Sequence, residues 1–144
     1  MISILRIRDH ESIRRCYPVM AQLRPHLDES AFCAQVERQF ESQGYHLVAL
    51  ESEGAIVSVA GYRFLENLVY GPYLYVDDLI TDAARRGQGF GGQLFDWLVE
   101  EARREGVCAL HLDSGVQRFD AHRFYLGKSM EVTSRHFGLQ LQGG

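Results

Sequence analysis

Seven residues near the middle of the chain read Arg86-Gly87-Gln88-Gly89-Phe90-Gly91-Gly92. Four glycines in six residues cost conformational entropy that an ordinary loop would avoid. The stretch leads into a helical pattern whose apolar face carries Leu94, Leu98 and Ala102. Glycine lets successive N–H groups point into one hollow, and a helix N-terminus adds the positive end of its dipole. The stretch therefore predicts an anion-binding loop, most simply for a pyrophosphate.

The residues before this loop predict strands and two helices. Residues 45–50 and 55–64 are rich in β-branched and aromatic side chains, and Ser52-Glu53-Gly54 between them favours a turn, so we expect an antiparallel hairpin. A third strand over residues 73–81 returns beside the second. The chain opens with a strand over residues 2–8 and then two helices, for which the N-caps are Asp9 and either Asp28 or Ser30, and which Pro25 separates.

The residues after the loop complete the expected order. A helix from Phe90 ends at Gly106, and a short buried strand follows over residues 107–113. A last helix over residues 120–127 and a closing strand over residues 131–141 give the order β-α-α-β-β-β-α-β-α-β. This pattern predicts an α/β fold of the α+β type, with a mixed sheet in which a crossover helix makes one strand pair parallel. A length of 144 residues fits one domain, residues 1–144.

Composition excludes several classes of protein. The net charge is -4, and no cluster of basic residues alternates with aromatic ones, which argues against nucleic acid as a partner. No apolar run approaches the ~20 residues that cross a bilayer, and the charged start MISILRIRDHESIRR does not resemble a signal peptide, so we expect a cytoplasmic protein without a membrane partner. Three cysteines without a C-x-x-C pair indicate neither a disulfide framework nor a metal site.

A dinucleotide-binding loop is one alternative for the glycine-rich stretch. Gly87, Gly89 and Gly92 fit the pattern G-x-G-x-x-G, and Asp113 follows about 20 residues later. That pattern should directly follow the first strand of a parallel sheet. Here residues 82–85 intervene, and the preceding strands are predicted to be antiparallel. A dinucleotide-binding oxidoreductase is therefore the weaker alternative.

Two motifs resemble a known family. With Arg86, Gly89 and Gly91 at the marked places of R-x-x-G-x-G, the loop resembles the acyl-CoA signature of the GNAT superfamily of N-acetyltransferases. Residues 121–125, AHRFY, resemble the A-x-x-[LF]-Y segment of the same superfamily. The longer stretch over residues 117–125, QRFDAHRFY, is most similar to aminoalkylphosphonate N-acetyltransferases and related small-molecule members.

The resemblance implies a mostly antiparallel sheet that is splayed at its centre, and acetyl-CoA as cosubstrate. The backbone of the strand over residues 73–81 would pair with the pantetheine arm, and the N–H groups of the glycine-rich loop would bind the pyrophosphate. The cofactor-binding residues that it implies are Leu79, Ile80, Thr81, Arg86, Gly87, Gln88, Gly89, Phe90, Gly91, Gly92, Ala121 and Phe124. Tyr125 would be the general acid that protonates the departing thiolate.

Amine acylation also needs a base, because the nucleophile must be neutral. Asp77 and Asp78 are consecutive in an otherwise apolar strand, so one of them must face a buried layer or a cleft. A buried carboxylate is costly without a partner, which makes Asp78 a candidate base and leaves a salt bridge or a strand bulge as the structural alternative. Asp113, twelve residues before Tyr125, is the rival candidate. His111 and His122 could relay protons.

These observations predict a cytoplasmic N-acetyltransferase, an acyltransferase that moves the acetyl group directly to a primary amine of a small molecule or peptide. The amine would approach beside Tyr17, Arg24, His26 and residues 65–71, and nearby acidic residues favour a cationic amine. A homodimer is left open. The alternative from another class is a catalytically silent acyl-CoA-binding regulatory protein, which would need neither the acid Tyr125 nor a base.

Overall fold

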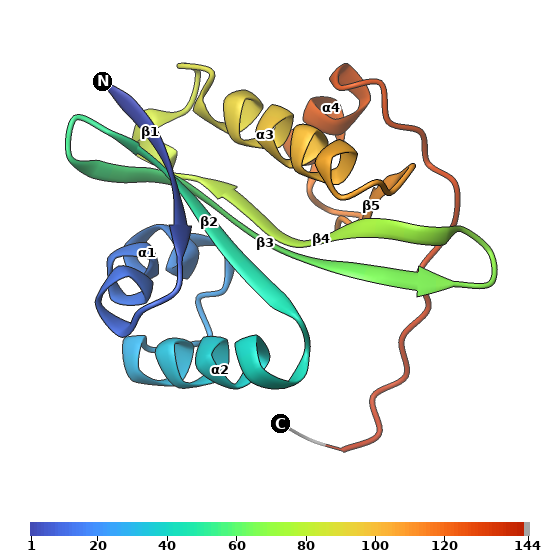
Figure 1. Ribbon diagram of the computed structural model, residues 1–144, viewed down its shortest axis with the longest axis horizontal. Helices are drawn as coiled ribbons and strands as arrows, with labels where there is room; N and C mark the ends of the chain where they lie inside the picture. Colours follow the sequence, from blue (N-terminus) through green and yellow to red (C-terminus); the bar gives the residue numbers. More distant parts are fainter. Residues whose placement is uncertain (143–144) are drawn as a thin grey trace. The chain divides into compact units, whose positions relative to one another are not determined.

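A five-stranded mixed sheet organises the first of the two units that the chain forms, Met1–Leu112 (Figure 1). The structure is a computed structural model that describes residues 1–142. Along the sheet the strands are β1 (Ile2–Ile7), β2 (Tyr45–Ser52), β3 (Ala55–Asn67), β4 (Gly71–Thr81) and β5 (Leu110–Leu112). The first three strand pairs are antiparallel and the pair β4–β5 is parallel. The predicted mixed sheet, with its antiparallel hairpin and one parallel pair, is therefore confirmed.

Helices cover both faces of this sheet (Figure 1). Helices α1 (His10–Leu23) and α2 (Glu29–Ser42) pack on one face, and α3 (Phe90–Arg104) packs on the other. The carboxylates of Asp9 and Asp28 each accept a hydrogen bond of 2.8 Å from the backbone three residues on, so Asp28 rather than Ser30 caps α2. Among the described residues, no helix is long and apolar enough to span a membrane.

A β-bulge in β4 changes which face the strand presents. The register pairs Val76 with Tyr62 and Asp78 with Gly61, which leaves Asp77 as the extra residue. Val76 belongs to the core under α3, whereas Ile80, four residues later, belongs to the core under α1 and α2. Without the bulge both residues would lie on one face, because side chains alternate along a strand. The bulge therefore brings Asp78 to the face that α1 and α2 cover.

The sheet is splayed between its last two strands. Only Leu74–Val76 of β4 pair with β5, and β4 then runs on to Thr81 without a β5 partner among the described residues. The splay was expected at the centre of the sheet. It lies next to the final strand instead, since no strand follows β5 in the part of the sheet that the structure describes.

The predicted closing strand over residues 131–141 is wrong. The second unit, which begins at Asp113, contains α4 (Phe119–Gly127), and residues 131–142 form neither helix nor strand. Phe137, Leu139 and Leu141 do alternate with polar neighbours, but they are 85–89% exposed. Alternation favours an extended backbone, whereas a strand also requires a neighbour to complete its ladder of hydrogen bonds. Residues 131–142 make no such ladder within the described chain.

Candidate active site

The glycine-rich loop begins α3 with an open N-terminus. Gly87 and Gly89 have φ angles of +83° and +82°, which favour glycine strongly, and Gly89 is the N-cap residue of α3. No side chain caps the helix there. The first backbone N–H groups, those of Phe90, Gly91 and Gly92, therefore have no side-chain cap, and their binding of an anion stays a prediction. A Cβ added to Gly87 or Gly89 would meet no atom within 4 Å, so the protein leaves space in front of the loop.

The end of β4 offers a backbone edge directly before this loop. The N–H of Asp82 donates to the carbonyl of Val57 on β3 over 2.8 Å, and the carbonyl of Ile80 accepts from Ser58 Oγ on the same strand. Peptide groups alternate in direction along a strand, so those of Leu79 and Thr81 face the opposite edge. That edge is the one from which β5 has separated. Leu79 and Thr81 can therefore pair with an extended ligand.

A short turn connects this edge to the loop and is held by α1. Asp82 caps the 3₁₀ helix η1 (Ala83–Arg85) by accepting from the N–H of Ala84. The amide of Gln22 on α1 donates to Asp82 and accepts from the N–H of Ala83. Arg86 is exposed, as a residue beside a bound phosphate would need to be. The strand edge and the loop are thus joined by a short turn that α1 holds in place within the first unit.

A cavity of about 300 Å³ lies beside the bulge on the α1–α2 face. Its lining residues are Met20, Arg24, His26, Leu27, Phe32, Gln35, Val36, Gln39, Tyr45 and Asp78. Arg24 and His26 were expected near an acceptor, and both line the cavity. Tyr17 instead donates from its hydroxyl to the carbonyl of Leu27 over 2.9 Å, and residues 65–71 do not line the cavity.

Asp78 is the carboxylate of this cavity, and both of its oxygens accept hydrogen bonds. Arg24 approaches Oδ1 through Nε at 3.0 Å and Nη2 at 2.9 Å, and it also donates to the carbonyl of Asp77. The hydroxyl of Tyr45 donates to Oδ2 over 2.7 Å. Burial first, and then the adjacent Asp78 carboxylate, raise the pKa of Tyr45 well above its usual value. Both structural alternatives for the acidic pair, a bulge and a salt bridge, are therefore present.

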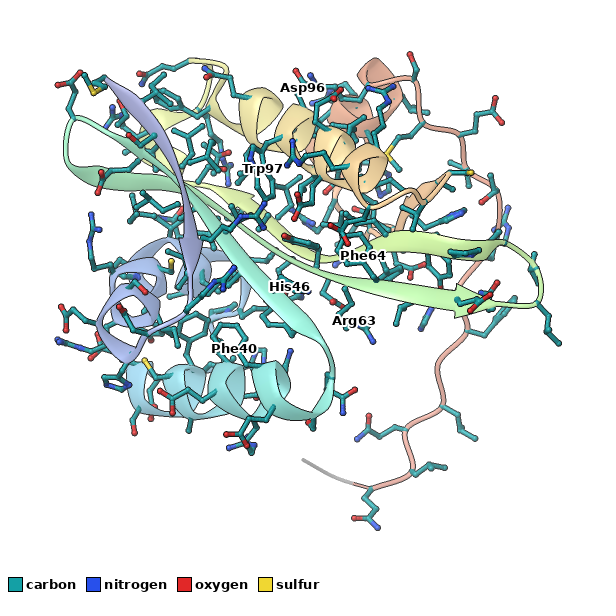
Figure 2. All side chains as sticks on the ribbon, viewed as in Figure 1. Phe40, His46, Arg63, Phe64, Asp96 and Trp97 are labelled. Atoms are coloured by element: carbon teal, nitrogen blue, oxygen red, sulfur yellow. The ribbon has the colours of Figure 1, made fainter. Side chains whose placement is uncertain are left out.

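Asp77 has a different partner. Its two oxygens accept from Nε and Nη2 of Arg63 on β3, at 2.7 and 2.8 Å, and Arg63 is labelled in Figure 2. Neither residue lines the cavity. Each carboxylate of the acidic pair is thus matched by one guanidinium, and the preference for a cationic amine stays a prediction.

Tyr45 is a site residue that sequence reasoning missed. Its ring stacks on Phe40 of α2, which is labelled in Figure 2, and lies directly over Gly61 of β3. A Cβ on Gly61 would lie 1.8 Å from the Tyr45 hydroxyl. A glycine inside a strand indicates close approach of another group, so Gly61 was the available signal.

The second unit carries the residues that the resemblance placed on the last helix. Ala121, Phe124 and Tyr125 all lie on α4, and the ring of Phe124 contacts that of Tyr125 edge-on. Burial raises the pKa of Tyr125, whereas the guanidinium of Arg118 opposes this shift. Tyr125 is therefore protonated at neutral pH, as a general acid must be. The position of Tyr125 relative to the glycine-rich loop stays a prediction.

The other predicted proton carriers have local partners. Asp113 is exposed, and one of its oxygens lies 3.9 Å from Nδ1 of His136. His122 contacts the carbonyl of Gly115 at 2.8 Å, and His111 stacks on Tyr70 with ring centroids 3.9 Å apart. These contacts give both histidines structural roles. Within residues 1–142, no group of three or more His, Cys, Asp or Glu side chains could hold a metal ion.

Comparison with known proteins identifies the family. The profile of the Acetyltransferase (GNAT) family matches residues 9–128. The chain is 34% identical over 128 residues to the uncharacterized N-acetyltransferase YhdJ of Bacillus subtilis. The matched region covers 89% of this chain and 90% of that protein. It is 28% identical over 116 residues to the aminoalkylphosphonate N-acetyltransferase of Salmonella typhimurium, covering 80% and 75% of the two chains. The chain therefore belongs to the acetyltransferase (GNAT) family.

The solved structures agree with this assignment at the level of the fold. The aminoglycoside N-acetyltransferase AAC(6')-Iy in complex with CoA has a TM-score of 0.85 and 14% sequence identity, and the match covers 99% of this chain and 96% of that one. The predicted superfamily and the expectation of an acyltransferase that uses acetyl-CoA are confirmed by the family and its relatives. The alternative of a doubly wound dinucleotide-binding fold is wrong, because antiparallel strands and η1 precede the loop.

Proposed function

We propose that this protein transfers the acetyl group of acetyl-CoA directly to the primary amine of a small molecule. The observation that carries the proposal is the open strand edge at Leu79 and Thr81, which runs into the uncapped N-terminus of α3. The amide groups of a pantetheine arm match such an edge. The pyrophosphate of the same molecule matches a helix N-terminus. The strand edge and the helix N-terminus are adjacent in the protein, just as the pantetheine arm and the pyrophosphate are adjacent in CoA.

The donor would be held mainly by backbone atoms. Leu79, Ile80 and Thr81 would form the strand beside the pantetheine, and the N–H groups of residues 88–92 would bind the pyrophosphate, with Gly87 shaping the turn and Arg86 beside it. Ala121 and Phe124 on α4 are the remaining proposed CoA contacts, and they rest on the resemblance alone. The open space in front of Gly87 and Gly89 supports this role for the loop.

The transfer needs no nucleophile from the enzyme. The amine nitrogen forms a bond to the thioester carbonyl carbon, the bond between carbon and sulfur breaks, and CoA departs as a thiolate. The acceptor ammonium loses two protons in total, of which one ends on the CoA sulfur and one passes to solvent. Asp78 or the rival Asp113 would take the first proton, and Tyr125 would protonate the thiolate. Burial raises the pKa of Cys16 to about 12, which makes this thiol unsuited to form an acyl-enzyme.

A small acceptor fits the cavity better than a peptide does. A volume of about 300 Å³ lies at the lower end for ligand sites, which span roughly 300–1,000 Å³. The cavity adjoins the donor edge through Asp78, the residue directly before Leu79. The name of the Salmonella relative specifies aminoalkylphosphonates, which are small primary amines. Both observations support a small-molecule acceptor.

Thermal shift and turnover with acetyl-CoA, CoA and NAD test the proposal. A ligand at ~100 times its dissociation constant adds ~2.7 kcal/mol to the free energy of unfolding, which raises the melting temperature measurably. We expect a rise with acetyl-CoA and CoA, none with NAD, and release of CoA thiol when an amine is added. A rise with acetyl-CoA without turnover on any amine would support the catalytically silent alternative. No rise with either CoA form would overturn the proposal.

A further inference from the structure

We propose that the acceptor is a small zwitterion, an amine that also carries an anionic group, and that Arg24 determines this specificity by exchanging its partner Asp78 for that anion. This inference rests on the proposed function and names the acceptor class of the same site. Arg24 and Asp78 both line the cavity, and they are already joined there as an ion pair at 2.9 Å.

The ion pair balances the negative charge of Asp78 in the cavity lining with the positive charge of Arg24. The hydrogen bonds of Arg24 and Tyr45 occupy both oxygens of Asp78. An incoming ammonium that approaches Oδ1 meets the guanidinium of Arg24 there, and the two positive charges repel each other. The neutral hydroxyl of Tyr45 does not repel the ammonium, so the ammonium competes with Arg24 for Oδ1 and Tyr45 can stay on Oδ2. Acceptor binding and the loss of this ion pair are then a single event.

Exposure indicates which partner moves. The side chain of Asp78 is 15% exposed and is also held by Tyr45, whereas that of Arg24 is 41% exposed. Arg24 follows the last residue of α1 as its C-cap, where a long side chain can turn without moving the helix. Arg24 is thus the mobile member of the pair, and Asp78 stays at the donor edge.

The fate of the released guanidinium sets the class of acceptor. A diamine or a simple amine would leave the guanidinium of Arg24 bonded to the carbonyl of Asp77 but without a carboxylate partner, and one strong hydrogen-bonded pair would be lost. An acceptor with its own anion restores the balance: its ammonium pairs with Asp78 and its anion pairs with Arg24. Carboxylates and phosphorus oxyanions both fit the planar fork of arginine. The volume of the cavity keeps the spacing between the two charges short.

The exchange also prepares the base. While Arg24 holds Oδ1, the guanidinium lies where the ammonium of the acceptor would have to approach that oxygen. Once the guanidinium has turned to the anion of the acceptor, the same oxygen faces the ammonium that must lose a proton. Binding of a zwitterion therefore frees Asp78 for the role that the proposed reaction gives it.

A matched series of two-carbon amines tests the inference. The probes are aminoethylphosphonate, β-alanine, ethanolamine and ethylenediamine, which differ only in the group at the far end. We expect the two anionic amines to be acetylated with a kcat/KM about 10- to 100-fold above the other two, the range of one hydrogen-bonded charge. The two anionic probes distinguish a phosphonate from a carboxylate as the preferred partner.

Variants of two arginines show whether Arg24 is responsible. Arg24→Gln should bring the four kcat/KM values within about threefold of one another, and Arg24→Lys should retain part of the preference. Arg63→Gln is the matched control, because Arg63 pairs with Asp77 at the same bulge but does not line the cavity. It should leave the preference unchanged. The KM for acetyl-CoA should stay constant in both Arg24 variants.

Three outcomes overturn the inference while leaving the proposed function intact: ethylenediamine or ethanolamine as the fastest probe, a preference that survives in Arg24→Gln, or no turnover of any probe although acetyl-CoA raises the melting temperature and another amine is acetylated. Absence of any stabilisation by acetyl-CoA would instead remove the proposed function, and the inference with it.

Discussion

Gly89 is the position at which the backbone of the proposed pyrophosphate site can be perturbed most cleanly. Its φ angle is +82°, and an added Cβ would meet no protein atom within 4 Å. Gly89→Ala therefore introduces conformational strain without a clash inside the protein. An L-residue in this left-handed region costs about 1–2 kcal/mol. We expect the variant to relax this strain by leaving the conformation that aims the first N–H groups of α3 at the ligand.

The magnitude for CoA binding follows from that strain. If CoA binds only the loop conformation of the wild type, the substitution raises the free energy of that conformation by about 1–2 kcal/mol. The affinity for CoA then falls about 5- to 30-fold. Gly106, just beyond the opposite end of α3, provides a matched control, since its φ angle is +78° and its Cβ position is equally open. Gly106→Ala should lower the melting temperature by a similar amount or more, without changing the affinity for CoA. Calorimetric titration with CoA and thermal unfolding measure both effects.

Two results would refute this reasoning. If Gly89→Ala binds CoA like the wild type, the loop is only a turn at the start of a helix. If Gly106→Ala loses as much affinity as Gly89→Ala, the effect comes from general destabilisation of α3 and not from the loop. Gly89→Val extends the series, because its branched side chain would also occupy the space of the ligand, and it should abolish measurable binding.

Three further predictions concern other parts of the chain. Tyr125→Phe should keep acetyl-CoA affinity within a few fold and lower kcat about 10²-fold, the lower end for a lost general acid; full turnover with chemistry rate-limiting would leave Tyr125 as a packing residue. Hydrogen bonds from Arg6 lower the pKa of Glu101 to about 2, so the unfolding free energy should fall by about 3 kcal/mol as the pH drops from 4.5 through 2, and Glu101→Gln should remove this dependence in acid-unfolding curves. Gly61→Ala should displace Tyr45 and cost about 1–3 kcal/mol in thermal unfolding, whereas Gly127→Ala, with open space at its Cβ, should be tolerated.

The parts of the fold that could be predicted depend on neighbouring residues. Asp9 and Asp28 cap helices that begin one residue later, and the inward face of α3 follows from its spacing. The hairpin of β2 and β3 follows from two apolar runs joined at Glu53 and Gly54, both of which have positive φ angles. The prediction of a closing strand over residues 131–141 was wrong although the alternating pattern is present. A strand also needs a partner strand, and local alternation does not reveal one.

The candidate site also has one part that could be predicted from the sequence and one part that could not. The loop and the strand edge before it were predictable, since glycine density and strand propensity are local properties. The contacts among Arg24, Tyr45 and Asp78 were not, because these residues lie 33 and 54 positions apart along the chain. Their meeting depends on the bulge at Asp77, which makes Asp78 and not Asp77 the next residue of the ladder after Val76 and so places Asp78 on the α1–α2 face. A bulge leaves no reliable pattern in a single sequence beyond two adjacent aspartates in an apolar strand.

That bulge connects the two halves of the proposed reaction. The bulge directly follows Val76, the last residue of β4 that pairs with β5, so the strand edge proposed for the donor opens where the bulge begins. Asp78, the next residue of the ladder, lines the acceptor cavity. Removing the extra residue, as in a deletion of Asp77, would restore ordinary alternation with Asp78 directly after Val76, still opposite Gly61 and still on the α1–α2 face. The deletion should therefore leave Asp78 in the acceptor cavity but lower the affinity for CoA in calorimetric titration, because β4 loses the bulge at which its donor edge opens, whereas Arg24→Gln should alter the acceptor side alone.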